Sequence, residues 1–192
     1  METISFIFDE MKAAQAAAYL LSLHEAPMND ISLMTLLYFS DRLSLEKYHS
    51  TITTDSYFSM KSGPIPSGIY DYLKHNESTD IWKSYIKKAN QYSVRSAKKM
   101  DDADFDCLSI EDKEILSSVY DKYKNTDQLE LSKISHTFPE WQNPGNSRSP
   151  ISIESILQAT IDCPDELKDA ERELKLASFL NNENIRNKES ET

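Results

Sequence analysis

The stretch that decides the fold spans residues 57–70 and reads YFSMKSGPIPSGIY. It contains two of the chain's three glycines and two prolines separated by one residue. Glycine supplies positive φ, whereas proline fixes φ at about −65° and removes a backbone donor. A chain this poor in glycine therefore concentrates its unusual backbone at one place. We predict a stiff corner here, made by a short strand at 57–61 and a helix that opens at Pro66 and runs to about Lys74.

Helices are expected on both sides of this corner. Alanines and leucines at helical spacing predict a helix over residues 9–23. An apolar face that includes Leu33, Leu36 and Leu37 predicts a second helix over residues 31–48, at the centre of the core. Downstream, capping residues and prolines predict four more helices, over 109–123, from Asp127 to a stop at Pro139, from Ser149-Pro150 to Leu157, and from Cys163-Pro164 onward.

The region between these helices predicts a little β-structure. Residues 83–88 and 92–96 alternate weakly between polar and apolar, so we expect a hairpin that pairs with the strand at 57–61. The expected fold is mainly α, a compact bundle of about six to seven helices with a small two- or three-stranded antiparallel β-sheet. Residues 1–180 form a single domain, and residues 181–192 have too few apolar side chains to pack and are expected to be a mobile tail.

The composition describes a globular protein of 192 residues, 39% of them apolar, with a net charge of −11. No apolar run is long enough to span a membrane. The only candidate export signal is the stretch at 13–23. Acidic residues at 2, 9 and 10 precede it, where a signal peptide has basic residues. Cys107 and Cys163 are isolated and have acidic neighbours, as expected of reduced thiols in a cytoplasm. We therefore expect a cytoplasmic protein with no membrane partner.

The basic residues are clustered. Six of them occur within residues 83–99, a span with no acid, and they are Lys83, Lys87, Lys88, Arg95, Lys98 and Lys99. Interleaved aromatic residues are typical of surfaces that bind single-stranded nucleic acid. The acidic chain as a whole opposes the approach of a polyanion. A solvated face, or one that meets a protein partner, is the preferred interpretation, and nucleic-acid binding is the alternative.

No pattern of catalytic or metal-binding residues is present. The four histidines lie far apart in sequence and lack zinc-ligand spacing. The prolines at 64 and 66 cannot donate to a phosphate, and Cys107 lies among acids that disfavour its thiolate. We expect no cofactor and no enzyme activity, and an unrecognised enzyme is the third functional class.

Three polar or aromatic residues outside the corner stand out. His136 follows an amphipathic stretch and precedes Trp141, so the indole is expected to fold back toward the helix end. The pair is interpreted either as a structural staple or as a partner contact. Asp41 places a carboxylate in an otherwise apolar helix, where it would be a buried anchor for the Gly63 corner or a ligand.

The order of these pieces resembles the Panacea domain family, best known for SocA-like antitoxins of bacterial and phage toxin–antitoxin systems. The resemblance begins with LLYFSD at 36–41, continues through the corner, and extends over roughly residues 9–160. Its later blocks are LSIEDKEIL at 108–116, VY at 119–120, LSKISH at 131–136 and PEW at 139–141. Ser40 and the pair at 59–60 depart from the family pattern, which would alter a partner-facing surface and leave the fold unaffected.

The resemblance implies an antitoxin that neutralises a cognate toxin by direct protein–protein binding, with a proteolytic adaptor as a variant of this role. A DNA-binding transcriptional regulator that uses the basic hairpin is the alternative. The partner would be a toxin protein, with a protease in the adaptor variant, and the sequence leaves the oligomeric state open. The residues nominated as partner-binding or corner-forming are Asp41, Tyr57, Lys61, Gly63, Pro64, Pro66, Tyr70, His136 and Trp141.

Overall fold

The computed structural model describes residues 3–75 and 78–190. Its elements in chain order are α1 (Glu10–Ser22), β1 (Met28–Asn29), α2 (Asp30–Tyr48), β2 (Tyr57–Met60), β3 (Gly63–Pro66), α3 (Ser67–Lys74), α4 (Asp80–Tyr85), β4 (Ile86–Asn90), β5 (Ser93–Ser96), the 3₁₀-helix η1 (Asp102–Phe105), α5 (Ile110–Tyr123), α6 (Gln128–Ser135), β6 (Ser149–Ile151), α7 (Ile153–Thr160) and α8 (Pro164–Ser190). Helices predominate and two small three-stranded antiparallel sheets accompany them, which confirms the mainly α fold class.

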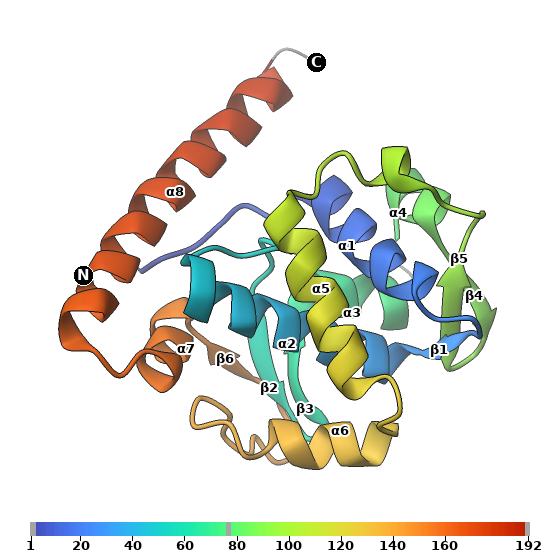
Figure 1. Ribbon diagram of the computed structural model, residues 1–192, viewed down its shortest axis with the longest axis horizontal. Helices are drawn as coiled ribbons and strands as arrows, with labels where there is room; N and C mark the ends of the chain where they lie inside the picture. Colours follow the sequence, from blue (N-terminus) through green and yellow to red (C-terminus); the bar gives the residue numbers. More distant parts are fainter. Residues whose placement is uncertain (1–2, 76–77, 191–192) are drawn as a thin grey trace.

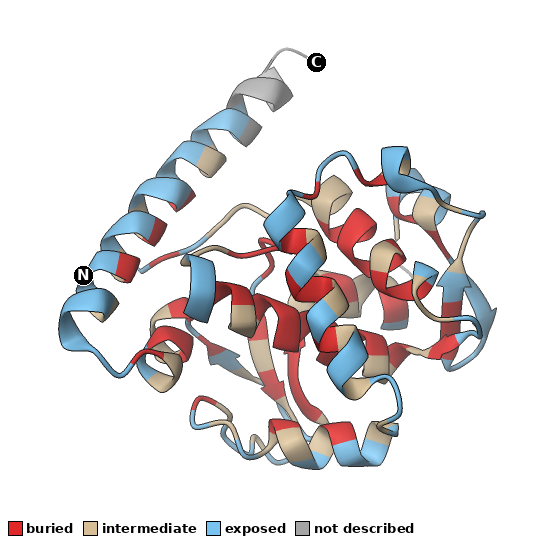
Figure 2. Ribbon diagram, viewed as in Figure 1, coloured by how far each residue is buried: buried red, intermediate tan, exposed pale blue. Residues whose placement is uncertain are grey.

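Helix α2 is the centre of the core, as the sequence predicts. Residues 33–41 are buried without interruption, so this part of the helix is covered on all sides, as is typical of a helix in the interior. Helices α1, α5, α6 and α7 and strand β3 all contact it. Figure 1 shows α2 running behind α5, with β2 and β3 beside it. The buried alanines of α1 allow its neighbours to approach closely, and Figure 2 shows the buried residues gathered on these central elements.

The basic hairpin forms, but it pairs with a different strand from the one expected. Strands β4 and β5 pair with each other, and β5 continues the sheet to β1 through Met28 opposite Val94. Strand β2 is unavailable to the hairpin because β3 and β6 occupy its two sides. The prediction that the hairpin joins the strand at 57–61 is therefore wrong. Lys83 also lies outside the hairpin, on α4.

The predicted corner is a second hairpin. Gly63–Pro66 forms β3, with Ile65 opposite Phe58, and the helix opens at Ser67 with Pro66 as its N-cap residue. Strand β3 lies at the sheet edge, where proline is tolerated because no ladder partner is needed on the outer side. Because Pro64 and Pro66 are two residues apart, the positions of both missing N–H groups lie on that outer side.

The turn between β2 and β3 is held from outside by α6 and the segment after it. Ser132 Oγ donates to the carbonyl of Ser62 at 2.7 Å, and Trp141 Nε1 donates to the carbonyl of Met60 at 3.0 Å. Gly63 has φ +120°, and a Cβ at this position would lie 2.2 Å from Ser135 Oγ. Glycine is therefore required both by the backbone conformation and by the close approach of α6.

The C-terminal elements differ from expectation in two places. Ser149 and Pro150 belong to strand β6, and α7 opens three residues later, where Ser152 caps it by accepting from the Ser155 N–H. The long α8 continues as helix through Ser190, so residues 181–190 of the segment expected to be a tail are helical. The mobility of that segment stays a prediction, and residues 191–192 lie outside the described residues.

We expect Gly63→Ala to lower the free energy of unfolding by about 3 kcal/mol or more, because the new Cβ meets Ser135 in a conformation that side chains rarely adopt. The matched control is Gly145→Ala. Gly145 also has positive φ, but a Cβ added there would have no other atom within 4 Å, so its cost should be about 1 kcal/mol. Urea denaturation of the three proteins measures both effects. Equal costs at the two positions would contradict the close approach of α6.

Candidate functional site

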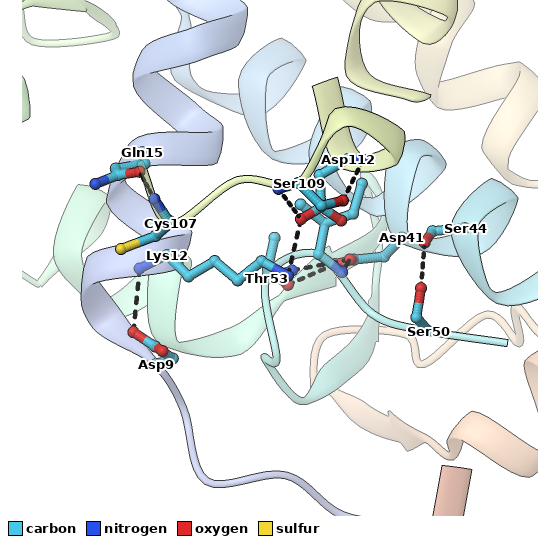
Figure 3. A network of polar contacts seen from close by, with 11 residues as sticks. Asp9, Lys12, Gln15, Asp41, Ser44, Ser50, Thr53, Cys107, Ser109 and Asp112 are labelled. Carbon is cyan, nitrogen blue, oxygen red and sulfur yellow. Dashed lines mark hydrogen bonds and ion pairs between the residues drawn. The ribbon is translucent and has the colours of Figure 1, made fainter. Parts of the chain in front are cut away.

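Two buried aspartates organise the connection between α2 and β2. Asp41 is completely buried on α2 and accepts hydrogen bonds from the N–H groups of Ile52 and Thr53 at 2.7 and 3.0 Å, and from the Thr53 hydroxyl. Figure 3 shows its carboxylate pointing at Thr53, with Ser44 and Ser50 bridged nearby. Asp41 is thus a buried anchor, but it holds residues 52–53 and not the Gly63 corner that the sequence suggested.

Asp55 supplies the anchor that the corner needs. Its Oδ1 accepts from the N–H groups of Ser56 and Gly68, both at 2.8 Å, and its Oδ2 accepts from that of Ile69 at 3.0 Å. These donors include the first turn of α3, whose own N-cap residue, Pro66, makes no side-chain cap. Asp55 therefore caps a helix that begins twelve residues later in the chain and fixes it against β2.

Burial raises the pKa of both carboxyl groups. The pKa of Asp55 rises from 3.8 to about 7 because the group is desolvated, against the opposing effect of its three N–H donors. The pKa of Asp41 is also raised by burial, against the hydrogen bonds from Thr53 and Ile52. The hydroxyl of Thr53 links the two, because it donates to Asp41 and accepts from the N–H of Asp55 at 3.3 Å.

A groove of about 700 Å³ opens beside this network, and we call it the β2 groove. Its walls are the N-terminal segment 3–6, residues 55–59, strand β6, helix α7 and the residues Pro139, Glu140 and Gln142, and its lining is mainly apolar. Figure 1 shows β2, β6 and α7 lying next to one another below α2. Concave, largely apolar surfaces with a few polar groups are typical binding sites.

Glu140 is one of the residues that line the groove, but its side chain is fully buried. Its Oε1 accepts hydrogen bonds from the Tyr38 hydroxyl and from Arg42 Nε, both at 2.8 Å. Its Oε2 is buried and has no hydrogen-bond partner among the residues that the structure describes. Burial, with a contribution from Glu140, raises the pKa of the Tyr38 hydroxyl far above its usual value, so Tyr38 remains a donor. The Arg42 guanidinium also lies 4.1 Å from the centre of the Phe138 ring.

The nominated residues fall into a buried set and an exposed set. Tyr57, Gly63, Pro64 and Pro66 are buried, so they shape the corner from inside. Tyr57 packs edge-on against Tyr38, with ring centres 5.5 Å apart. Lys61 is exposed at the tip of the β2–β3 turn, and Tyr70 on α3 is half-buried against His75, away from that turn.

His136 and Trp141 lie together as the sequence predicts. Their rings are stacked, with centres 3.9 Å apart and planes inclined by 18°. Both are half-buried, and the indole N–H is committed to the Met60 carbonyl. The pair therefore closes α6 onto the β2–β3 turn while part of its surface remains accessible to solvent.

The basic residues are only partly available for binding. Lys88 Nζ lies 3.5 Å from Asp30 Oδ2 and donates to the Leu73 carbonyl, and Lys98 is paired with Asp104. Lys87 and Arg95 are exposed and directly opposite each other on β4 and β5, so they share one face. Lys83 and Lys99 are exposed on other elements. Because two of these residues pair with acids, the cluster has less positive charge available for binding than the sequence suggests. This weakens the case for nucleic-acid binding.

The described residues hold neither a cluster of metal ligands nor a membrane-spanning helix. Within residues 3–75 and 78–190, no three His, Cys, Asp or Glu side chains converge on a point where an ion would bind. No helix in this part of the chain is both long enough and apolar enough to cross a bilayer.

Sequence reasoning missed Asp55, Arg42 and Glu140. Asp55 and Arg42 carry no motif, because each acts on residues far away in the chain. Glu140 stands in the PEW block at 139–141, but its pairing with Tyr38 and Arg42 spans about a hundred residues. Only the position of Asp55, two residues before a strand and ahead of a helix without its own cap, offered a signal.

Comparison with known proteins gives a family match. A family model described as "Antitoxin SocA-like, Panacea domain" matches residues 33–142, more than half of the chain. The matched region contains most of α2, the Asp41 and Asp55 network, both hairpins and the Trp141 segment. Neither the curated proteins nor the solved structures contain a match to this chain.

We expect Asp41→Ala to lower the free energy of unfolding by at least about 3 kcal/mol, because it leaves two buried N–H groups and one hydroxyl without their acceptor. The control is Asp71→Ala. Asp71 is only half-buried and pairs with His75 at 3.1 Å, so its loss should cost less than about 1 kcal/mol. Urea denaturation followed by circular dichroism measures both. Similar costs for the two variants would contradict the anchoring role of Asp41.

The raised pKa of Asp55 predicts a pH dependence with a definite sign. Between about pH 4 and pH 7, the Asp55 carboxyl holds a proton in the folded protein but releases it in the unfolded chain. The bound proton stabilises the folded state. This stabilisation is complete below the pKa of Asp55 in the unfolded chain and is lost as the pH rises through its pKa in the folded protein. The unfolding free energy of the wild type, relative to Asp55→Asn, should fall by up to about 4 kcal/mol over this range. Denaturation curves of both proteins at several pH values test it, and a relative stability that rises with pH would contradict it.

Proposed function

The chain belongs to the SocA-like antitoxin family with the Panacea domain, and from this premise we propose that it neutralises a cognate toxin by binding it directly. Family membership is the observation that carries the proposal. An antitoxin acts by masking its target in a stable complex, so it needs a preformed surface and no catalytic group. The rigid hairpin and the β2 groove meet that requirement.

We place the toxin at the β2 groove and at the exposed turn beside it. The groove accepts an apolar side chain of the toxin as a central anchor, which is how compact interfaces gain most of their affinity. Lys61 and the stacked pair His136 and Trp141 form the rim.

The buried anchors support this arrangement by keeping the groove in one shape. Asp55 fixes the start of α3 to the beginning of β2, and Trp141 fixes the end of β2 to the segment that follows α6. A surface that is already ordered loses little conformational entropy on binding. An adaptor mode, in which the complex delivers the toxin to a protease, is a second form of the same proposal and requires the same contact.

The test begins with co-expression of the chain with each neighbouring open reading frame, scored for rescue from growth arrest and for co-purification. With the toxin in hand, Ala159→Trp should abolish rescue, because an indole on α7 fills the β2 groove. Ala89→Trp is the matched control on exposed β4, and it should rescue like the wild type. Thermal unfolding shows whether both variants are folded.

Two results would overturn the proposal at different levels. If no neighbouring product is neutralised or captured, the antitoxin function is wrong. If Ala89→Trp loses rescue while Ala159→Trp keeps it, the contact lies on the basic hairpin and the assignment to the groove is wrong. In the adaptor mode, toxin levels would fall in cells with an active protease and recover when that protease is removed.

A further inference from the structure

The outer face of α8 carries apolar side chains that no described part of this chain covers. Leu176 and Phe179 are each 61% exposed and Leu180 is 52% exposed. Figure 1 shows α8 as a long helix that projects from the body of the protein, and Figure 2 shows it exposed along most of its length. Exposed apolar residues that gather on one helix face indicate an interaction surface.

The opposite face of α8 is fixed to the rest of the protein. Ala170 and Leu174 are buried, and His49 Nδ1 lies 2.8 Å from Glu173 Oε2. Asn182 Oδ1 accepts from the N–H of Ile7 at 2.6 Å, and its Nδ2 donates to the carbonyl of Ser5 at 3.0 Å. The helix is therefore held to the N-terminal segment as far as Asn182, and its outer face points to solvent.

The residues along this outer face follow a heptad spacing. Alternating steps of three and four residues connect a set of six exposed side chains, which we call the outer seam: Asp169, Arg172, Leu176, Phe179, Glu183 and Arg186. This is the spacing of a helix that pairs with another helix along a seam. The two apolar residues lie at its middle, and an acid and a base lie on each side of them.

We propose that the outer seam pairs two copies of this chain as an antiparallel helix dimer. When a second α8 runs in the opposite direction, the outer seams of the two copies lie against each other, with Leu176 of one copy opposite Phe179 of the other. The same register places Arg172 opposite Glu183. It also places Asp169 opposite Arg186, and the two-fold axis repeats every pair.

Charge selects this partner and this direction. Within one helix, Arg172 already pairs with Asp169 at 3.1 Å and Arg186 with Glu183 at 3.5 Å, so the antiparallel dimer joins two such pairs into a four-charge cluster at each end. A parallel dimer in register would place each of these charges beside its own copy, which is repulsive. The sequence order acid, base, apolar, apolar, acid, base is thus complementary to its own reverse.

The dimer is expected to be weak. The outer seam extends along about 26 Å of helix and offers only a few apolar side chains, which is less than a standard interface. We expect a dissociation constant on the order of micromolar. The inference is independent of toxin binding, because it concerns the free protein and a face that points away from residues 5–7.

Sedimentation velocity of the full chain over a wide concentration range tests the proposal. The wild type should shift from monomer to dimer, and Leu176→Asp should stay monomeric at every concentration. Leu129→Asp is the matched control, since Leu129 is a 72% exposed leucine on α6, outside the seam, and it should dimerise as the wild type does. A wild type that remains monomeric up to on the order of 100 μM would overturn the proposal.

A charge exchange tests the register. Arg172→Glu alone and Glu183→Arg alone each create like-charge pairs on both sides of the two-fold axis, and each should weaken dimerisation by about tenfold or more. An equimolar mixture of the two variants should recover it, because the mixed dimer has opposite charges at both sites. Failure of the mixture to recover while each variant is folded would overturn the antiparallel register. If the chain is monomeric and Leu176→Asp instead loses a bound toxin, the seam belongs to the toxin and the dimer is wrong.

Discussion

The structure depends on two carboxylates that are buried in the segment between α2 and β2. Burying a carboxylate is unfavourable unless hydrogen bonds compensate it, and here each accepts three. Asp41 uses its bonds to hold the chain where it leaves the central helix. Asp55 uses its bonds to hold α3 to the start of β2. Because Thr53 contacts both, the segment 52–55 behaves as one hydrogen-bonded unit.

The position of the β2 groove follows from this unit. With the start of β2 fixed by Asp55 and its end fixed by the Trp141 indole, the strand has little freedom to move. Strand β6 pairs with one side of β2, while β3 with its two prolines pairs with the other. The fold therefore determines where the groove lies. Substitutions at the buried corner residues would reach a partner only by changing the shape of the groove.

The sequence predicts local features of this protein better than long-range ones. The run at 33–41 marks the central helix, and Gly63 marks the special backbone, because each depends on composition within a few residues. The stacking of His136 and Trp141 is also local, since the two residues are close together in the chain. The strand partner of the basic hairpin could not be predicted, because β1 has two residues and carries no strand pattern. Glu140 was missed because Tyr38 and Arg42 lie about a hundred residues away in the chain. Asp55 was missed because the helix that it caps begins twelve residues later.

The N-terminal segment connects the two surfaces on which the proposals rest. Its residues 3–6 form one wall of the β2 groove, where the N–H of Ile4 donates to Glu154 at 2.7 Å. Slightly further along the chain, the N–H of Ile7 donates to Asn182 on α8. The inner face of α8 therefore supports the groove, while its outer seam points the other way. A dimer formed through the seam leaves both grooves open, so the geometry is compatible with a complex in which two copies of this chain each hold one toxin.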